Sequence, residues 1–492
     1  MPRWRAIPAL LRRPPIRIAL LVAFALLFLG SRGIWDPDEG RYTNVAINMV
    51  QSGDWIVPHR DDDVAHWTKP PLTYWMVGAS LATFGRSAWA ARLPIALAYV
   101  ACTLLAWRIA RRLSPGSEIV AATMYATMLL PWIASQLVTT DFLLSMFEGM
   151  AMAAYVEGRW GDRHPRRWFL LMWVALALAF LTKGPPALLP LPGILAAESV
   201  LPDSRRVFSP AGLCLFIALA GSWYVAAIVR TPGLLDYLIG SEVVGRVASN
   251  RFGRHGQWYG WLVVYAPALL IGTLPWTRAV LRAIAAQVRC LPAWRHAQAR
   301  RADARHILLA AWWFLPVVVF CLARSRLPLY VLPVFLPLAV AAAAAFVQEG
   351  RRLRPWRLAL WCVGLVLVRI AAAHVPTSQD ARAWAEALRE RVPTTIDEVV
   401  FVEATPRYGL RLELGAEVET IGLQPVAIGA INPPFDEDLA TELHESAGDP
   451  HEVWVARQVH WADIDRRLRQ QGFAPVVRGA PWRGHIVFQL QP

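Results

Sequence analysis

The run PLYVLPVFLPLAVAAAAAFV, residues 328–347, contains no charged side chain over twenty consecutive positions. A bilayer-spanning helix needs about 17–25 predominantly apolar residues, so this run alone is long enough to cross a membrane. Comparable runs recur before and after it, and the whole chain of 492 residues is 56% hydrophobic and only 17% charged. Because soluble domains are about 25% charged, these figures favour a polytopic membrane protein and exclude a disordered chain.

The net charge of +14 is unevenly distributed along the chain. Residues 1–373 carry 39 basic and 18 acidic side chains, a net charge of +21, whereas residues 374–492 carry 11 and 18, a net charge of −7. The arginines recur in clusters between hydrophobic runs, which is typical of the positive-inside rule and argues against a nucleic-acid partner. We therefore predict two domains, a transmembrane domain over residues 1–373 and a soluble domain over residues 374–492.

The hydrophobic runs predict eleven transmembrane helices, with the N-terminus inside and the C-terminus outside. They are expected at about residues 18–30, 88–107, 117–136, 142–156, 168–182, 186–201, 208–228, 258–276, 306–323, 328–347 and 356–373. This topology leaves two long outer loops, residues 32–86 and 230–256. Leu72–Phe84 in the first loop is too short to span and is expected to lie along the membrane surface.

The C-terminal segment, residues 374–492, has a different pattern. Helical periodicity at 381–391 and 461–471 is mixed with strand-like runs at 398–402, 452–455 and 484–489. This mixture predicts a small α/β domain on the outer face. The five cysteines of the chain have neither metal-ligand spacing nor the pattern of a disulfide framework.

A cluster of charges follows the first hydrophobic run, in the sequence DPDEGRY at residues 36–42. Asp38, Glu39 and Arg41 lie within four positions, where a helix is expected to leave the bilayer. One interpretation is a solvated loop with a local salt bridge. The other is a functional site, because carboxylates beside long apolar runs are costly unless they bind or react.

Only two of the 50 basic residues are lysines, Lys69 and Lys183. Lys69 precedes two prolines and the predicted surface helix, and both lysines are expected at the outer membrane face. A lysine there can be a snorkelling anchor. It can equally bind phosphate, because the ammonium group is a compact charge with three donors.

Asp141 follows two threonines at the expected outer start of a span. It can be a helix N-cap or first-turn acid, or a site residue. The second outer loop adds further candidates, whose arginines can bind a phosphate or a lipid head group: Glu242, Arg246, Arg254, His255 and Tyr259. A divalent metal held by Asp38 and Asp141 stays open, and no glycine-rich phosphate loop predicts bound ATP.

Several of these motifs together resemble a known family. DEGRY (residues 38–42), SGDWIVP (52–58), KPP (69–71) with YW (74–75), and ARLP (91–94) are similar to motifs of the aminoarabinose transferase and protein mannosyltransferase-like glycosyltransferases, which have the GT-C fold. LTKGP (181–185), LPWT (274–277) and SRLPLY (325–330) follow in the same order. The resemblance covers most of residues 15–345.

The resemblance implies roles for the candidate residues. Asp38 takes the place of the catalytic aspartate and Asp141 that of a second active-site carboxylate, with Glu39 as a further catalytic candidate. The donor-phosphate ligands implied by the resemblance are Arg41, Lys69, Arg246 and Arg254. Further candidates for substrate binding are Tyr42, Tyr74, Lys183, Glu242, His255 and Tyr259. Two positions depart from the family, Thr68 and Val243, where glutamate and histidine are common.

The family uses polyprenyl-phosphate sugars on the periplasmic or lumenal side of the membrane. By resemblance we expect a glycosyltransferase of the bacterial inner membrane, whose acceptor is lipid A, another glycan or a protein. The chemistry needs cations on the departing phosphate and a carboxylate near the sugar. A polyprenyl-lipid flippase is the main alternative, but only Glu148 and Arg369 are expected deep in a span. A catalytically idle scaffold is the third interpretation.

Overall fold

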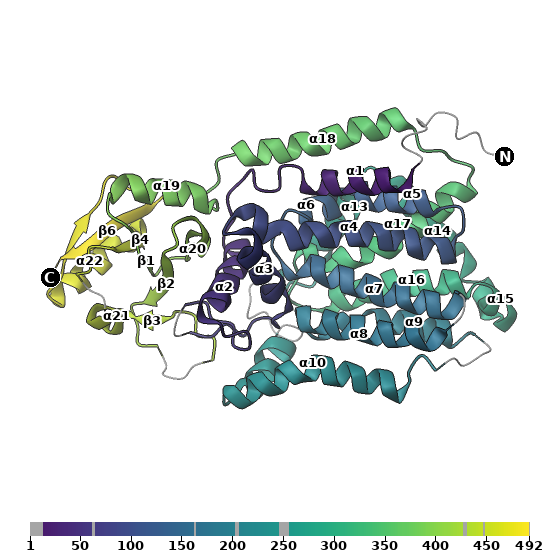
Figure 1. The fold of residues 1–492 in the computed structure, drawn as a ribbon, viewed down its shortest axis with the longest axis horizontal. Helices are drawn as coiled ribbons and strands as arrows, with labels where there is room; N and C mark the ends of the chain where they lie inside the picture. Colours follow the sequence, from purple (N-terminus) through teal and green to yellow (C-terminus); the bar gives the residue numbers. More distant parts are fainter. Residues whose placement is uncertain are drawn as a thin grey trace. The chain divides into compact units, whose positions relative to one another are not determined.

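The computed structural model describes residues 13–61, 64–161, 164–201, 206–245, 255–426, 431–445 and 448–491 (Figure 1). Its contacts divide the chain into two units. The helical unit consists of Met1–Leu27 and Pro94–Arg369, and the mixed unit consists of Phe28–Leu93 and Ile370–Pro492. Each unit is described by itself below.

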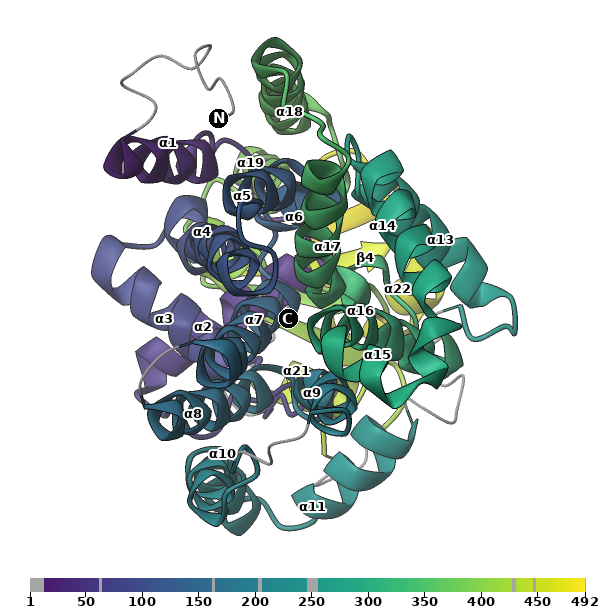
Figure 2. The same ribbon diagram turned by 90° about the vertical axis from the view of Figure 1, so that its right-hand side faces the viewer.

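The helical unit is the bundle of α-helices that Figure 2 shows end-on. Its elements are α1 (Pro14–Leu26), most of α4 (Ala88–Leu113), α5 (Glu118–Thr127), α6 (Leu129–Ala134), α7 (Thr140–Trp160), α8 (Pro165–Lys183), η2 (Pro185–Leu188), α9 (Pro190–Glu198), α10 (Pro210–Arg230), α11 (Leu234–Tyr237), η3 (Leu238–Val244), α13 (Gly260–Gly272), α14 (Thr277–Cys290), η4 (Ala293–Arg295), α15 (Ala297–Ala302), α16 (Ala304–Leu322), η5 (Pro328–Val334), α17 (Phe335–Gln348) and most of α18 (Pro355–His374). Within it, α7 packs against α8, and α17 packs against α5 and α14.

Every predicted span coincides with a helix or with a pair of short helices. Among the described residues, six helices are long and apolar enough to cross a membrane, or seven if α13 and α14, bent by 110°, form one span. The chain is therefore a multi-pass helical membrane protein, and the figure of eleven spans stays a prediction. The structure adds two details: the span at 117–136 is interrupted at Met128, and α14 occupies part of the expected basic inner loop.

Arg369 has a structural role inside the bundle. Its guanidinium donates to the backbone carbonyls of Phe24, Ala25 and Leu27 at 3.1, 3.2 and 2.9 Å, and to the hydroxyl of Ser135 at 3.1 Å. The last carbonyls of a helix have no partner within the helix, so this arginine satisfies the end of α1. One of the two mid-span charges expected for a flippase thus caps a helix.

The mixed unit combines the first outer segment with the C-terminal segment. Its elements are α2 (Asp38–Ser52), α3 (Leu72–Phe84), the start of α4, the end of α18, α19 (Ala381–Arg391), β1 (Glu398–Val402), α20 (Leu410–Glu413), β2 (Glu417–Gly422), β3 (Glu437–Asp438), α21 (Leu439–Glu445), β4 (Glu452–Arg457), η6 (Gln458–His460), α22 (Trp461–Gln470), β5 (Ala474–Val477) and β6 (His485–Gln491). The predicted helix at Leu72–Phe84 and the predicted C-terminal sheet are confirmed. The domain boundary at residues 373 and 374 stays a prediction.

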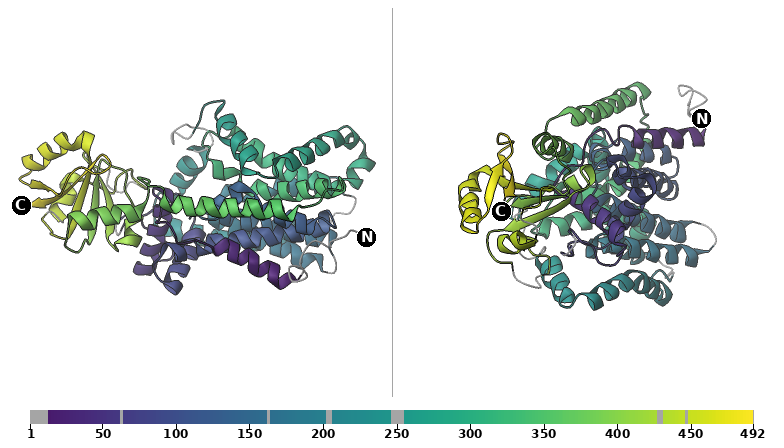
Figure 3. Two further views of the ribbon diagram at one scale, coloured as in Figure 1. Left: turned by 90° about the horizontal axis from the view of Figure 1, so that it is seen from above. Right: turned by 60° about the vertical axis from the view of Figure 1, so that its left-hand side comes forward.

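The six strands form one sheet in the order β3-β2-β1-β4-β6-β5. Figure 3 shows this sheet in green and yellow. β1 is parallel to β2 and β4, and β6 is antiparallel to β4 and β5. Because successive side chains point to opposite faces, the sheet carries two apolar clusters, one around Trp384 and Phe401 and one around Trp454 and Phe488. Both faces are buried, which explains the apolar run Val399–Val402.

Backbone hydrogen bonds join the segment just before α2 to the segment just before α19. The backbone N–H of Asp36 donates to the carbonyl of Gln379 at 2.8 Å, and that of Ala381 donates to Ile34 at 2.9 Å. Trp35 and Asp380 form an antiparallel bridge between them. The first turn of α2, which carries the predicted catalytic residues, is therefore held by the C-terminal segment.

Candidate active site

Glu39 lies in the first turn of α2 and is 2% exposed. Its carboxylate accepts hydrogen bonds from Arg92 at 2.7 and 2.9 Å, from Arg32 at 2.7 Å and from the backbone N–H of Trp35 at 2.9 Å. Burial alone raises the pKa of Glu39, but the two guanidinium groups lower it to about 2. This arrangement argues against the predicted catalytic role of Glu39 and favours a structural one, because both oxygens are already engaged.

Asp38 and Arg41 form the exposed part of the same turn. The side chain of Asp38 is 50% exposed, and its Oδ1 accepts a hydrogen bond from Nη2 of Arg41 at 2.5 Å. The Arg41 guanidinium lies 5.7 Å from the ring of Tyr42, which packs 5.8 Å from the ring of Tyr74. Within the described part of the chain, the buried Nε of Arg41 has no hydrogen-bond partner. The predicted local salt bridge is therefore present.

Lys69 lies in a second cationic group of the mixed unit. Its Nζ donates to the carbonyl of Thr68 at 2.5 Å, and the Thr68 hydroxyl lies 2.6 Å from Nε2 of His66. Burial, together with the charges of Arg41, Arg60 and Lys69, lowers the pKa of His66 well below its ordinary value. His66 is therefore neutral near pH 7 and adds no charge beside Lys69.

The C-terminal segment contributes residues to this region that sequence reasoning missed. Arg60 forms a buried ion pair with Asp436, and Nε of Arg411 donates to Oδ1 of Asn48 in α2 at 3.1 Å. Tyr408 is buried and interacts electrostatically with Arg41. These partners are separated by more than 300 positions in the chain, so no local motif could have identified them.

Asp141 and Lys183 meet within the helical unit. Asp141 lies in the first turn of α7 and Lys183 at the end of α8, and their side chains form an ion pair in which each is only 9% exposed. The Lys183 ammonium also lies 4.1 Å from the ring centroid of Tyr330. Glu148, two turns further along α7, is 3% exposed. Its Oε1 has no hydrogen-bond partner among the described residues.

The described residues of the second outer loop make hydrogen bonds within the helical unit. Glu242 accepts a hydrogen bond from the Tyr237 hydroxyl at 3.3 Å, and the carbonyl of His255 accepts from Arg326 at 2.6 Å. Tyr259 is 46% exposed. Arg246 and Arg254, predicted as phosphate ligands, lie outside the described residues. Their roles stay predictions.

The candidate metal ligands of this chain are carboxylates. Asp38 belongs to the mixed unit and Asp141 to the helical unit, and a metal held by both stays a prediction. Among the described residues, three carboxylates of the C-terminal sheet region have oxygens within 4.8 Å of one another: Glu398, Glu442 and Glu452.

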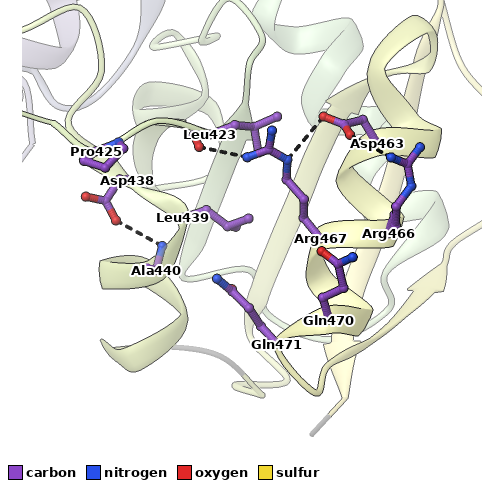
Figure 4. A pocket seen from close by; sticks show the side chains of 10 residues that line it. All are labelled: Leu423, Pro425, Asp438, Leu439, Ala440, Asp463, Arg466, Arg467, Gln470 and Gln471. Atoms are coloured by element: carbon purple, nitrogen blue, oxygen red, sulfur yellow. Dashed lines mark hydrogen bonds and ion pairs between the residues drawn. The ribbon is translucent and has the colours of Figure 1, made fainter.

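The C-terminal segment also contains a cavity of about 440 Å³, shown in Figure 4. Its basic side chains are Arg466 and Arg467. Both arginines pair with Asp463, at 3.6 and 3.3 Å, and Arg467 donates to the carbonyl of Leu423 at 3.1 Å. None of the predicted site residues lines this cavity.

The chain was compared with known protein families. Residues 68–225 match the family described as dolichyl-phosphate-mannose-protein mannosyltransferase. Among individual proteins, the undecaprenyl phosphate-α-4-amino-4-deoxy-L-arabinose arabinosyl transferase of Pseudomonas aeruginosa (strain UCBPP-PA14) is 31% identical over 369 residues, which are 72% of this chain and 64% of that protein. The protein of the same name from Aeromonas hydrophila is 30% identical over 356 residues, 70% of this chain and 62% of that protein. The match thus spans less than two thirds of these relatives.

Comparison with solved structures extends over nearly the whole chain. ArnT from Cupriavidus metallidurans bound to undecaprenyl phosphate has a TM-score of 0.79 and 20% sequence identity, over 96% of this chain and 97% of that one. The apo state of the same protein has a TM-score of 0.76 over 96% of each chain. The likeness establishes the fold, and together with the sequence matches it leads to one assignment. The chain belongs to the aminoarabinose transferase and protein mannosyltransferase-like family of GT-C membrane glycosyltransferases.

Proposed function

We propose that this protein transfers a sugar from a polyprenyl-phosphate-linked donor to an acceptor of the cell envelope. The observation that carries the proposal is the Asp38–Arg41 pair, in which an exposed carboxylate adjoins a guanidinium with an unused buried donor. The names of the relatives, which are undecaprenyl phosphate-dependent arabinosyl transferases, support the donor class. Lipid A, another glycan and a protein are the acceptors to be tested.

The proposed reaction breaks the bond between the sugar C1 and the phosphate oxygen and forms a bond from C1 to an acceptor oxygen. Negative charge then develops on the departing polyprenyl phosphate. Arg41 and Lys69 supply two cations for that charge, and the neutral His66 adds no charge of its own. Asp38 receives the acceptor proton or stabilises the positive charge that builds up on the sugar.

Further residues have proposed roles in the same reaction. Asp141, with Lys183 as its counterion, is the second carboxylate of the site. Arg246 and Arg254 assist in phosphate binding, and a divalent metal is one further means of holding the phosphate. Substrate contacts are proposed for Tyr42, Tyr74, Lys183, Glu242, His255 and Tyr259. We place the site on the periplasmic face of a bacterial inner membrane, as the positive-inside pattern predicts.

The proposal is tested by transfer of a labelled sugar from a polyprenyl-phosphate donor in membranes that contain the full chain. Asp38→Asn is expected to lower kcat by about 100-fold or more, since it removes the acid–base group. Lys69→Ala is expected to raise KM for the donor more than it lowers kcat. The matched control is Arg86→Ala, an exposed cation of the same unit, which should change neither value. Full activity in both site variants would refute the site assignment.

A flippase is the alternative function, and the observation that favours it is Glu148. A buried carboxyl within α7 is costly in a membrane and marks a polar path in some transporters. The two functions are separated with sealed vesicles containing the protein and labelled donor. Translocation of the donor without transfer to any acceptor, abolished by Glu148→Gln, would support the flippase. Transfer that survives Glu148→Gln supports the glycosyltransferase.

A further inference from the structure

Asp36 joins the segment that leads into α2 to a loop of the C-terminal segment. Its side chain is 2% exposed, and its Oδ1 and Oδ2 lie 3.1 and 3.3 Å from the backbone nitrogen of Gly409, which donates to them. Gly409 immediately precedes α20, more than 370 positions along the chain. The buried carboxyl therefore connects a distant loop to a point two residues before Asp38.

Two glycines make room for this carboxyl. A Cβ atom at Gly40 would lie 1.8 Å from Oδ1 of Asp36 and 2.7 Å from the nitrogen of Gly409. A Cβ atom at Gly409 would lie 2.5 Å from Cβ of Ala381 and 3.1 Å from Oδ2 of Asp36. Because atoms in folded proteins are close-packed, both positions exclude a larger side chain in this arrangement. We call Asp36, Gly40 and Gly409 the carboxyl seat.

The carboxyl seat lies next to the predicted site residues Asp38 and Arg41. Gly40 lies in the first turn of α2, between Asp38 and Arg41, so any shift of the seat moves both site residues. The backbone hydrogen bonds of Asp36 with Gln379 and of Ala381 with Ile34 fix the other side of the seat. The first turn of α2 is thus held from two directions by residues of the C-terminal segment.

We infer that Asp36 is a positioning residue, which couples the C-terminal segment to the first turn of α2 and thereby sets the placement of Asp38 and Arg41. The inference rests on the proposed function for its catalytic meaning, and it gives the C-terminal segment a role in that function. Residues 404–411 are then part of the architecture of the donor site.

The charge state of Asp36 follows from its surroundings. Burial, together with the charges of Glu39 and Asp380, raises the pKa of Asp36 to about 8 against the opposing effects of the Gly409 N–H and of Arg407. The folded state therefore keeps a proton that the unfolded chain loses near pH 4. The stability that this proton contributes is complete below about pH 4 and is lost as the pH rises through about 8.

The experiment compares hydrogen–deuterium exchange of residues 38–41 in the full chain with that in two variants. Gly409→Ala is expected to increase exchange in this turn by about 10-fold or more, and to lower kcat for sugar transfer more than it changes KM. Asp36→Asn keeps the size and the neutral state of the buried group. It should resemble the wild type near pH 7. Above about pH 8 it should keep the protection factor, which is exchange corrected for the intrinsic base-catalysed rate, that the wild type loses. Gly364→Ala, in α18 with open space around it, is the matched control.

The results distinguish the positioning role of Asp36 from the proposed transferase function. Unchanged exchange at residues 38–41 in Gly409→Ala overturns the inference, whether or not the protein transfers sugar. An identical alkaline loss of protection in the wild type and Asp36→Asn overturns it also, and this comparison remains available if Gly409→Ala fails to fold. A wild type that transfers no sugar, with the expected exchange pattern, contradicts the proposed function alone.

Discussion

Asp38 and Glu39 are adjacent in the chain, but their side chains occupy opposite environments. Asp38 is half-exposed and has one cationic neighbour, whereas Glu39 is buried against Arg32 and Arg92. The helix explains the difference, because neighbouring residues of a helix point about 100° apart. One side chain therefore faces solvent while the next faces the guanidinium groups of Arg32 and Arg92. The same functional group is therefore accessible at Asp38 and enclosed at Glu39.

The two residues predict opposite results for the same kind of substitution. Glu39→Gln leaves two buried guanidinium groups without an anion and is expected to lower the free energy of unfolding by about 3–5 kcal/mol. Asp38→Asn should change it by less than about 1 kcal/mol, because its ion pair is exposed. Sugar-transfer activity should fall more in Asp38→Asn than in Glu39→Gln, at temperatures where both variants are folded. Thermal unfolding in detergent and sugar transfer measure the two effects.

The stability difference between the wild type and Glu39→Gln is expected to depend on pH. The pKa of Glu39 is lowered to about 2 from an ordinary value of 4.5. Its contribution to stability is therefore complete above about pH 4.5 and is lost as the pH falls towards 2. The unfolding midpoint of Glu39→Gln should approach that of the wild type over this range. A constant gap between them would contradict the ionised state of Glu39.

The site could be predicted from sequence only where it is local. Asp38, Arg41 and Lys69 belong to short motifs beside a hydrophobic run, and the structure groups them in one unit. Arg60, with its partner Asp436, has no such motif, and neither has Tyr408. Their role depends on contacts between segments that only the fold brings together.

At the scale of elements, hydropathy predicted the positions of the helices well, because a span must be apolar along its whole length. The predicted helix at Leu72–Phe84 has the same bounds in the structure. The interruption at Met128 and the helix α14 were not foreseen, since neither changes the average hydropathy of its run. β2 was also missed. Its glutamates Glu417 and Glu419 obscure the alternation that identifies a strand.

The contact between α7 and α8 yields a prediction at this scale. Asp141 and Lys183 are buried together at the ends of these helices, so Lys183→Met leaves an uncompensated carboxylate. The variant is expected to lose about 3–5 kcal/mol of stability, and Asp141→Asn a similar amount. The double variant should lose less than the sum of the two, as double-mutant cycles show for residues in contact. Additive losses would contradict the ion pair.

At the scale of the whole molecule, the charge distribution sets the expected orientation. The excess of arginine in residues 1–373 predicts short inner loops, and the acidic C-terminal segment is expected on the opposite side. The likeness to ArnT, with a TM-score of 0.79 over almost the whole chain, supports the overall fold but leaves the orientation to be measured.

Cysteine labelling measures that orientation. Cys290 ends α14, in a predicted inner loop, and Gln470 is exposed in α22 of the C-terminal segment. A membrane-impermeant maleimide applied to intact spheroplasts should label a Gln470→Cys variant and leave Cys290 unmodified until the membrane is opened. The background lacks the other native cysteines: Cys102, Cys214, Cys321 and Cys362. The reverse pattern would contradict the predicted topology.

The central claim is that the protein is a transferase that uses the phosphate of a polyprenyl lipid as its leaving group. The most direct measurement follows the labelled donor in membranes with the wild type and with Asp38→Asn, and quantifies both the sugar transferred and the polyprenyl phosphate released. We predict that the wild type releases one polyprenyl phosphate for each sugar that reaches the acceptor, and that Asp38→Asn reduces both by about 100-fold. Donor that crosses the membrane intact, with no sugar transferred by the wild type, would contradict the claim.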